Sequence, residues 1–133
     1  SDLAPIRKLP VTDLTLYQTA LIKDLTPLKG MAITNLNLGW TGVTDLAPLA
    51  GLPLTKLTLC DNPVKDLSPL AGCTNLEVFL YTLKGHPDKE YPDAEALRKL
   101  PRLKTFGLDD KWLAAYDFWQ MYDKKKAEKG SAK

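Results

Sequence analysis

Residues 45–51, DLAPLAG, return as DLSPLAG at residues 66–72, 21 positions further along the chain. Residues 24–30, DLTPLKG, stand another 21 positions upstream, and residues 2–6, DLAPI, stand 22 before that. A fixed period of this length is typical of a repeat architecture, in which one supersecondary unit stacks on copies of itself. The repeat therefore predicts a solenoid.

A second phrase lies between these repeats. Residues 54–62, LTKLTLCDN, follow the pattern LxxLxLxxN, and residues 33–41 and 11–19 follow it with threonine in the last place. The alternation at 57–59 has period two, so it predicts a strand with its leucines inward and Thr58 outward. Asn62 has donors and acceptors for the backbone groups of the turn that follows, whereas Thr41 and Thr19 can satisfy fewer of them. Asp45 is expected to cap a short turn, and Gly51 to allow the reversal into the next strand.

These interleaved phrases resemble the short bacterial type of leucine-rich repeat, over about residues 1–108. The resemblance implies an α/β fold, a right-handed leucine-rich repeat solenoid. About five short parallel strands would line its concave face, short turns its convex face, and a helical cap its C-terminal end. Because the chain opens inside a repeat, we expect it to be the C-terminal part of a longer array in a larger bacterial protein.

The sequence predicts three parts: a solenoid over 1–108, a capping helix over 109–127 and a disordered tail over 128–133. Strands are expected near 12–16, 34–38, 55–59, 76–81 and 103–108, each on the LxxLxL pattern. Residues 92–100, PDAEALRKL, predict a helix of about two turns, with acidic residues at its start and basic residues near its end.

The final helix is expected to run from Lys111 to about Lys126. Each repeat, a strand with the turn that follows it, is called a coil below. Trp112, Tyr116 and Trp119 have the spacing i, i+4, i+7, so they are expected to share one helix face and to cover the open end of the last coil. Phe118 and Tyr122 are expected to project elsewhere. The lysine-rich residues from 124 onward are expected to be disordered.

The charge, hydropathy and cysteine content of the chain bear on its partners and its environment. The 133 residues carry 18 basic and 16 acidic side chains, a net charge of +2 that gives no general reason to expect a nucleic acid. No apolar run approaches the roughly 18 residues of a membrane span, so we expect no membrane insertion of this segment. Cys60 and Cys73 do not form a CxxC pair and are expected to be free thiols. The segment is expected to be monomeric.

Candidate catalytic residues are few. The single histidine, His86, falls in the loop 82–91, and the position of Ser68 is taken by Thr26 and Ala47 in other coils, which indicates a structural role rather than part of a triad. Two cysteines and one histidine at unrelated spacings fall short of a zinc site. The ladder of Asp24, Asp45 and Asp66 is explained by capping rather than by calcium. We therefore predict no catalytic residue, cofactor or metal, and an enzyme site in loop 82–91 is the least favoured reading.

The concave sheet face remains, which in the family is the usual protein-binding surface. The predicted protein-binding residues are Asp13, Thr15, Tyr17, Asn35, Asn37, Trp40, Lys56, Thr58, Val78 and Leu80, and the other residues expected to point outward are Gly39, Cys60, Thr82, Thr105, Gly107 and Asp109. Aromatic and apolar groups on such a face favour an interface over a plain solvated sheet.

The sequence thus predicts a non-enzymatic protein-interaction module whose partner is another protein. Two alternatives stay open: a structural terminus that only caps a longer array, and an accessory domain of an enzyme such as a protein kinase.

Overall fold

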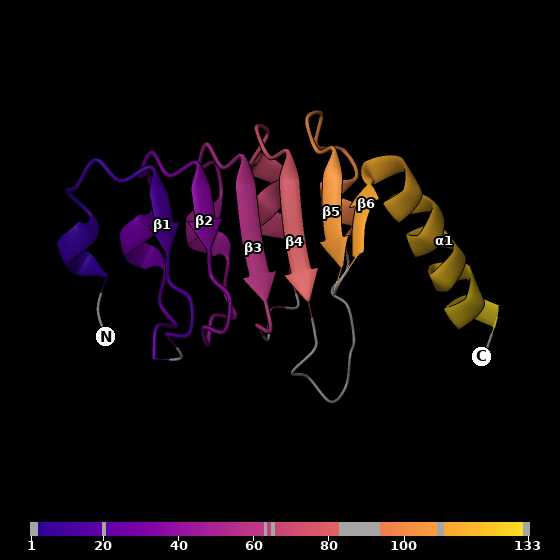
Figure 1. Ribbon diagram of the computed structural model, residues 1–133, viewed down its shortest axis with the longest axis horizontal. Helices are drawn as coiled ribbons and strands as arrows, with labels where there is room; N and C mark the ends of the chain where they lie inside the picture. The colour runs from indigo at the N-terminus through magenta and orange to yellow at the C-terminus, as the bar shows by residue number, and fades with distance from the viewer. Residues whose placement is uncertain are drawn as a thin grey trace.

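A computed structural model describes residues 3–19, 21–62, 64, 66–82, 94–108 and 111–131. One sheet of six strands runs in chain order from β1 to β6, short 3₁₀ turns connect the parallel strands, and one α-helix follows at the C-terminal end (Figure 1). The strands are β1 (Asp13–Thr15), β2 (Asn35–Asn37), β3 (Lys56–Cys60), β4 (Val78–Thr82), β5 (Thr105–Leu108) and β6 (Lys111–Ala114); the 3₁₀ turns are η1 (Ala4–Ile6), η2 (Thr26–Leu28), η3 (Ala47–Leu49), η4 (Ser68–Gly72) and η5 (Glu95–Leu97); the helix is α1 (Ala115–Ser131).

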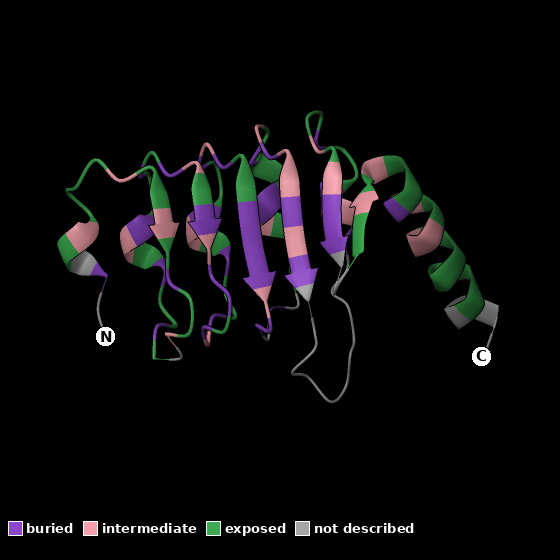
Figure 2. Cartoon of the chain, viewed as in Figure 1, coloured by how far each residue is buried: buried purple, intermediate pink, exposed green. Residues whose placement is uncertain are grey.

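The first five strands pair in parallel, as the repeat predicts. Their inward residues stack in one row, in the order Leu14, Leu36, Leu57, Phe79 and Phe106. Buried positions run through β2 to β5, whereas the edge strands β1 and β6 are exposed or half-buried (Figure 2). The core is therefore continuous across the coils, because each inward side chain packs between its two neighbours.

The turn after β3 contains Asn62, the asparagine at the end of the LxxLxLxxN phrase. Asn62 is fully buried, its Nδ2 donates to the Leu38 carbonyl at 2.6 Å, and its Oδ1 accepts from Thr41 Oγ1 at 3.0 Å. Thr41 and Thr19 instead donate to carbonyls within their own coils, those of Leu38 and Leu16. The asparagine therefore links two coils through both Leu38 and Thr41, whereas the bond of Thr19 closes only its own turn.

The aspartates of the DLxPL phrase bind the first backbone N–H of each 3₁₀ turn, as predicted for Asp45, although the N-cap residue itself is the leucine that follows them. Asp24, Asp45 and Asp66 each accept a hydrogen bond of 2.9 Å from the backbone N–H two residues further on. Gly30 and Gly51 lie at φ +77° and +78°, the left-handed region that reverses the chain toward the next strand. These two features mark where η2 and η3 begin and end.

Residues 111–114 do not form the first turn of a helix, and this part of the prediction was wrong. They form β6, which pairs antiparallel with β5 in the register Phe106↔Leu113 and Gly107↔Trp112. The Ala115 N–H then donates to the Lys104 carbonyl at 2.8 Å. Leu113 packs against the core, so the run alternates with the period of a strand.

The ends of two predicted helices also differ. The helix α1 extends to Ser131 rather than ending near residue 127, because lysine, alanine and glutamate favour helix and no glycine interrupts them before Gly130. In place of a two-turn helix over 92–100, the structure has the single turn η5, and residues 92 and 93 lie outside the described part. Leu97 and Leu100 are both buried like the equivalent residues of η4, so packing against that coil favours the tight turn.

The buried face of α1 differs from the predicted one. Because the helix begins at Ala115, Phe118 points into the core, where its ring stacks on Phe106 with centroids 3.7 Å apart. Trp112 and Tyr116, which the helical spacing placed in the contact, are 60% and 73% exposed. Trp119 does pack against the core, beside Phe118.

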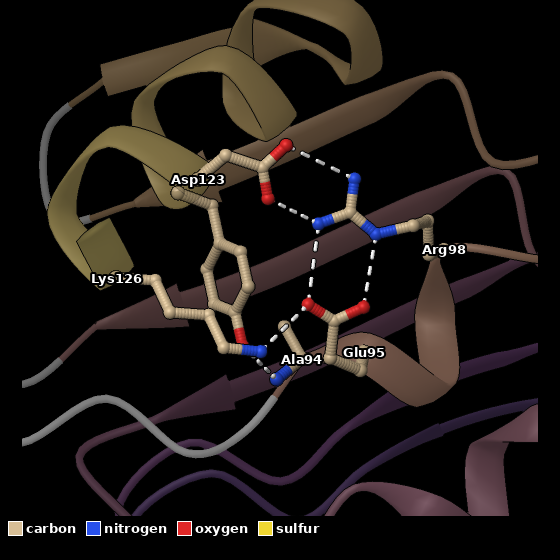
Figure 3. A network of polar contacts seen from close by, with 6 residues as sticks. Ala94, Glu95, Arg98, Asp123 and Lys126 are labelled. Atoms are coloured by element: carbon tan, nitrogen blue, oxygen red, sulfur yellow. Dashed lines mark hydrogen bonds and ion pairs between the residues drawn. The ribbon is translucent and has the colours of Figure 1, made fainter. Parts of the chain in front are cut away.

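A network of charges ties α1 to the coil that contains η5 (Figure 3). The Arg98 guanidinium bonds Glu95 at 2.9 Å and Asp123 at 2.5 Å, and Lys126 Nζ lies 3.2 Å from Glu95 Oε1. Arg98 also lies over the Trp119 ring, 4.3 Å from its centroid, which adds a cation–π contact. The helix is therefore held to the sheet by aromatic packing and to η5 by ion pairs.

We predict that Asn62→Ala lowers the free energy of unfolding by about 1–3 kcal/mol, because the Leu38 carbonyl loses a buried donor. Thr19→Ala, at the equivalent place in the first coil, is expected to cost less, because its hydroxyl serves only its own turn. Urea denaturation followed by circular dichroism measures both. Equal losses for the two variants would contradict the assigned role of Asn62.

Phe118→Ala is predicted to lower the free energy of unfolding by about 3–5 kcal/mol, the usual loss for a truncated core phenylalanine. Tyr116→Ala, two residues away but exposed, should change it by less than about 0.5 kcal/mol. Thermal and urea unfolding of the two variants would compare them. A small effect of Phe118→Ala would show that the sheet is stable without the helix packed against it.

Hydrogen bonds from Arg98 and then Lys126 lower the pKa of Glu95 below its ordinary value of 4.5. A carboxyl group whose pKa is lower in the folded state stabilises the fold above its unfolded pKa and loses that contribution as the pH falls through the folded pKa. We therefore expect the free energy of unfolding to decrease on acidification below about pH 4.5, and Glu95→Gln to make that decrease shallower. Urea unfolding across this range measures the slope, with Asp117→Asn as the control, and an unchanged slope for Glu95→Gln would contradict the assignment.

Candidate functional site

One face of the sheet is covered by the 3₁₀ turns, and the other, which we call the open face, carries the alternate side chains of the strands. The strand registers arrange the open face in two rows. The first row is Asp13, Asn35, Lys56, Val78, Thr105 and Ala114, and the second is Thr15, Asn37, Thr58, Leu80, Gly107 and Trp112.

The eight strand residues predicted to bind protein all lie in these rows. Most of them are exposed or half-buried, but Thr58 is only 8% exposed and offers little surface. Thr58 lies in the middle of its row, between Asn37 and Leu80. Of the other residues expected to point outward, Gly39 is buried and Cys60 is half-buried, while the side chain of Thr82 and all of Asp109 lie outside the described part.

Tyr17 and Trp40 form an exposed aromatic pair beside the carboxyl ends of β1 and β2. Their rings meet edge to face, with centroids 5.0 Å apart and an interplanar angle of 79°. Gly39 makes room for the pair, because a Cβ at that position would lie 3.0 Å from the Tyr17 ring and 3.2 Å from Asn37 Oδ1. Asn37 in turn accepts a hydrogen bond from the Gly39 N–H at 2.9 Å. Gly39 and Asn37 thus leave room for the contact between the two rings.

The backbone at Trp40 is strained. Trp40 has φ +53°, and Gln18 and Asp61, at the equivalent positions of the neighbouring coils, have φ +58° and +53°. A residue with a Cβ loses roughly 1–2 kcal/mol in this region relative to its preferred conformations. The turn demands this conformation, and a large aromatic side chain stands where glycine would be easiest to accommodate.

The opposite end of the open face is apolar. Leu80 and Trp112 lie over Gly107, since a Cβ there would come within 2.1 Å of Leu80 Cδ1 and 3.2 Å of the Trp112 ring. Sequence reasoning missed Trp112, because it assigned residues 111–114 to a helix. The signal that would have found it is the pair of apolar runs 103–108 and 111–114, which are separated by two residues as in a hairpin.

The two rows carry almost no net charge. Asp13 and Lys56 are the charged residues in them, and their signs are opposite. A partner would therefore be recognised through aromatic, apolar and hydrogen-bonding contacts rather than through a strong field. The centre of the face offers amides and hydroxyls, and its two ends offer aromatic rings.

Few side chains in the described part of the chain could act as a nucleophile or as a general acid or base. Cys60 and Cys73 are free thiols, as predicted, and burial raises the pKa of Cys73, whose Sγ lies 3.3 Å from the Leu49 carbonyl. Burial likewise raises the pKa of Tyr81 to about 12, and its hydroxyl donates to the Val64 carbonyl at 3.2 Å. Both groups therefore belong to the core. His86 and the rest of 83–93 lie outside the described residues.

Among the residues that the structure describes, no cluster of three or more His, Cys, Asp or Glu side chains is placed to hold a metal ion. Within the same ranges, none of the helices has the length and apolar character needed to cross a membrane.

The fold is similar to that of a leucine-rich repeat protein of known structure. The chain superimposes on the crystal structure of internalin C2 from Listeria monocytogenes with a TM-score of 0.65 and 32% sequence identity. The match covers 81% of this chain and 46% of the internalin C2 chain, so this chain spans less than half of that protein's length. No model of a known protein family and no curated protein sequence matches the chain. The chain thus has an internalin-like α/β repeat fold.

Proposed function

We propose that this chain is a protein-interaction module of the leucine-rich repeat type and that its partner, another protein, contacts the open face. In this proposal the coils form a right-handed solenoid that continues a longer array, and α1 serves as its C-terminal cap. The pair of Tyr17 and Trp40 carries the proposal, because exposed aromatic rings held in a strained turn contribute nothing evident to the core. Similarity to internalin C2, a leucine-rich repeat protein, supports the same reading.

The composition of the open face fits an interface. Tyrosine and tryptophan are enriched among the residues that dominate binding energy, and they tend to be surrounded by contacts of smaller effect. Here Tyr17 and Trp40 lie at one end and Leu80 and Trp112 at the other, with Asn37 between them. A partner that spans the face would meet an aromatic group at each end.

The size of the face limits the affinity. Six strands at a spacing of about 4.8 Å, each of three to five residues, give a projected area of roughly 300 Å². A stable interface buries about 800 Å² per partner. We therefore expect either modest affinity or a contact that continues onto the loops beside the aromatic pair.

The test is affinity capture with this chain as bait, followed by mass spectrometry and a binding titration of the captured protein. Trp40→Gly and Trp112→Ala are each expected to weaken binding by about tenfold or more, the effect of removing an interface hot spot. Trp40→Gly also relieves the strained backbone, so lost binding cannot be attributed to unfolding if circular dichroism and thermal melting are preserved.

Leu21→Ser is the matched control, because Leu21 is also a large exposed apolar residue but lies in a turn outside the two rows. The control should bind like the wild type. If no protein depends on Trp40 or Trp112 for capture, the open face is not an interface and the structural reading of the chain is favoured.

A further inference from the structure

A basic hollow lies at the N-terminal end of the molecule, away from the open face. It has a volume of about 340 Å³ and lies between the segment that follows η1 and the segment that follows η2. Its walls include Arg7, Lys8 and Lys29, together with the apolar side chains of Leu9 and Met31. This volume lies at the small end of the range for ligand pockets, roughly 300–1,000 Å³.

The charge around the hollow is of one sign. Among the residues that the structure describes, its lining contains three basic side chains and no acidic one. In the described part of the chain, no carboxylate forms an ion pair with Arg7, Lys8 or Lys29. The three side chains are exposed, and Leu9 beside them is also exposed although it is apolar. The hollow therefore offers both positive charge and uncovered apolar surface.

The repeat shows that these charges are not required by the fold. Arg7 and Lys29 occupy the fourth turn position, counted from the first residue of each 3₁₀ turn, and Ala50 and Ala71 occupy it in the next two coils. Ala50 caps a turn with the same hydrogen bonding as η2, and Ala71 lies within the longer turn η4. A basic side chain at this position is therefore not required to form the turn.

The last coil shows what a basic residue at the fourth turn position does. There it is Arg98, which bonds Asp123, a carboxylate presented by the next element, and stacks against Trp119 (Figure 3). Arg98 thus binds two carboxylates, Glu95 of its own turn and Asp123 of α1, and one aromatic ring at the C-terminal end of the molecule. At the N-terminal end the same position carries Arg7 and Lys29, and the exposed side chain of Leu9 provides the apolar surface.

We propose that the N-terminal hollow docks an acidic peptide segment, whose carboxylates pair with Arg7 and Lys29 while an adjacent apolar side chain covers Leu9. Charge complementarity identifies the occupant, since a lining of three cations and no anion favours a segment rich in glutamate or aspartate. The hollow shares no residue with the open face. The assignment therefore stands or falls independently of the protein-interaction function proposed above.

The test uses the whole chain and a fluorescein-labelled peptide of alternating Glu-Glu-Leu units, with a Gln-Gln-Leu peptide of equal length for comparison. Fluorescence anisotropy is measured for the wild type and for Arg7→Ala/Lys29→Ala, which introduces the residue that two other coils carry at this position. The acidic peptide is expected to bind the wild type and to bind the double variant about tenfold more weakly, as loss of two ion pairs implies. The glutamine peptide is expected to bind the wild type at least as weakly as the acidic peptide binds the double variant.

Arg102→Ala/Lys104→Ala is the control, because it removes the same net charge from exposed residues outside the hollow. It should bind the acidic peptide like the wild type, and circular dichroism should show both variants folded. Arg7→Gln/Lys29→Gln replaces the alanine variant if that one unfolds. Equal affinity of the two double variants, or of the two peptides, would overturn the proposal. Displacement of the peptide by inorganic phosphate, but not by chloride at equal ionic strength, would also overturn it in favour of a simple anion site.

Discussion

No coil of this protein can bury its own leucines, and the rest of the structure depends on that constraint. Leu57 is fully buried because it lies between Leu36 and Phe79 of the adjacent strands. Asn62 satisfies a carbonyl of the preceding coil rather than of its own. Stability therefore comes from contacts between neighbours, and the two ends differ from the middle. At the C-terminal end Phe118 stacks on Phe106, whereas at the N-terminal end Leu14 stays half-buried.

The repeat made most of the fold predictable. Each LxxLxL phrase yields a strand and each DLxPL phrase a capped 3₁₀ turn, because both depend on local spacing and local hydrogen bonds. Prediction failed where the repeat stops. Residues 111–114 are a short apolar run beside a strong helix, and periodicity alone cannot separate strand from helix over four residues. Their pairing with β5 shifted the phase of the following helix, so Phe118 rather than Trp112 entered the core.

The open face was predictable in outline for the same reason. Period two places alternate residues outward, so the rows follow once the strands are known. The burial of Thr58 could not be predicted in the same way, because period two gives the direction of a side chain and not how far its neighbours cover it. The position of Trp112 on the open face could not be predicted either, because it depends on the antiparallel pairing of β6 with β5, which is not part of the repeat. The strained conformation of Trp40 is a property of its turn, shared with two other coils.

The position of Arg98 bears on how such a chain can change in length. Arg98 belongs to the last coil but forms an ion pair with Asp123 of α1, so this coil and the helix form one terminal unit. If that coil were removed, the helix would meet the preceding coil, which has Ala71 at the position of Arg98 and so could not form the ion pair with Asp123. An internal block of 21 residues, by contrast, can be duplicated or deleted with every strand register kept. In evolution the array can therefore grow or shrink from its middle, in steps of about 4.8 Å, while both ends keep their chemistry.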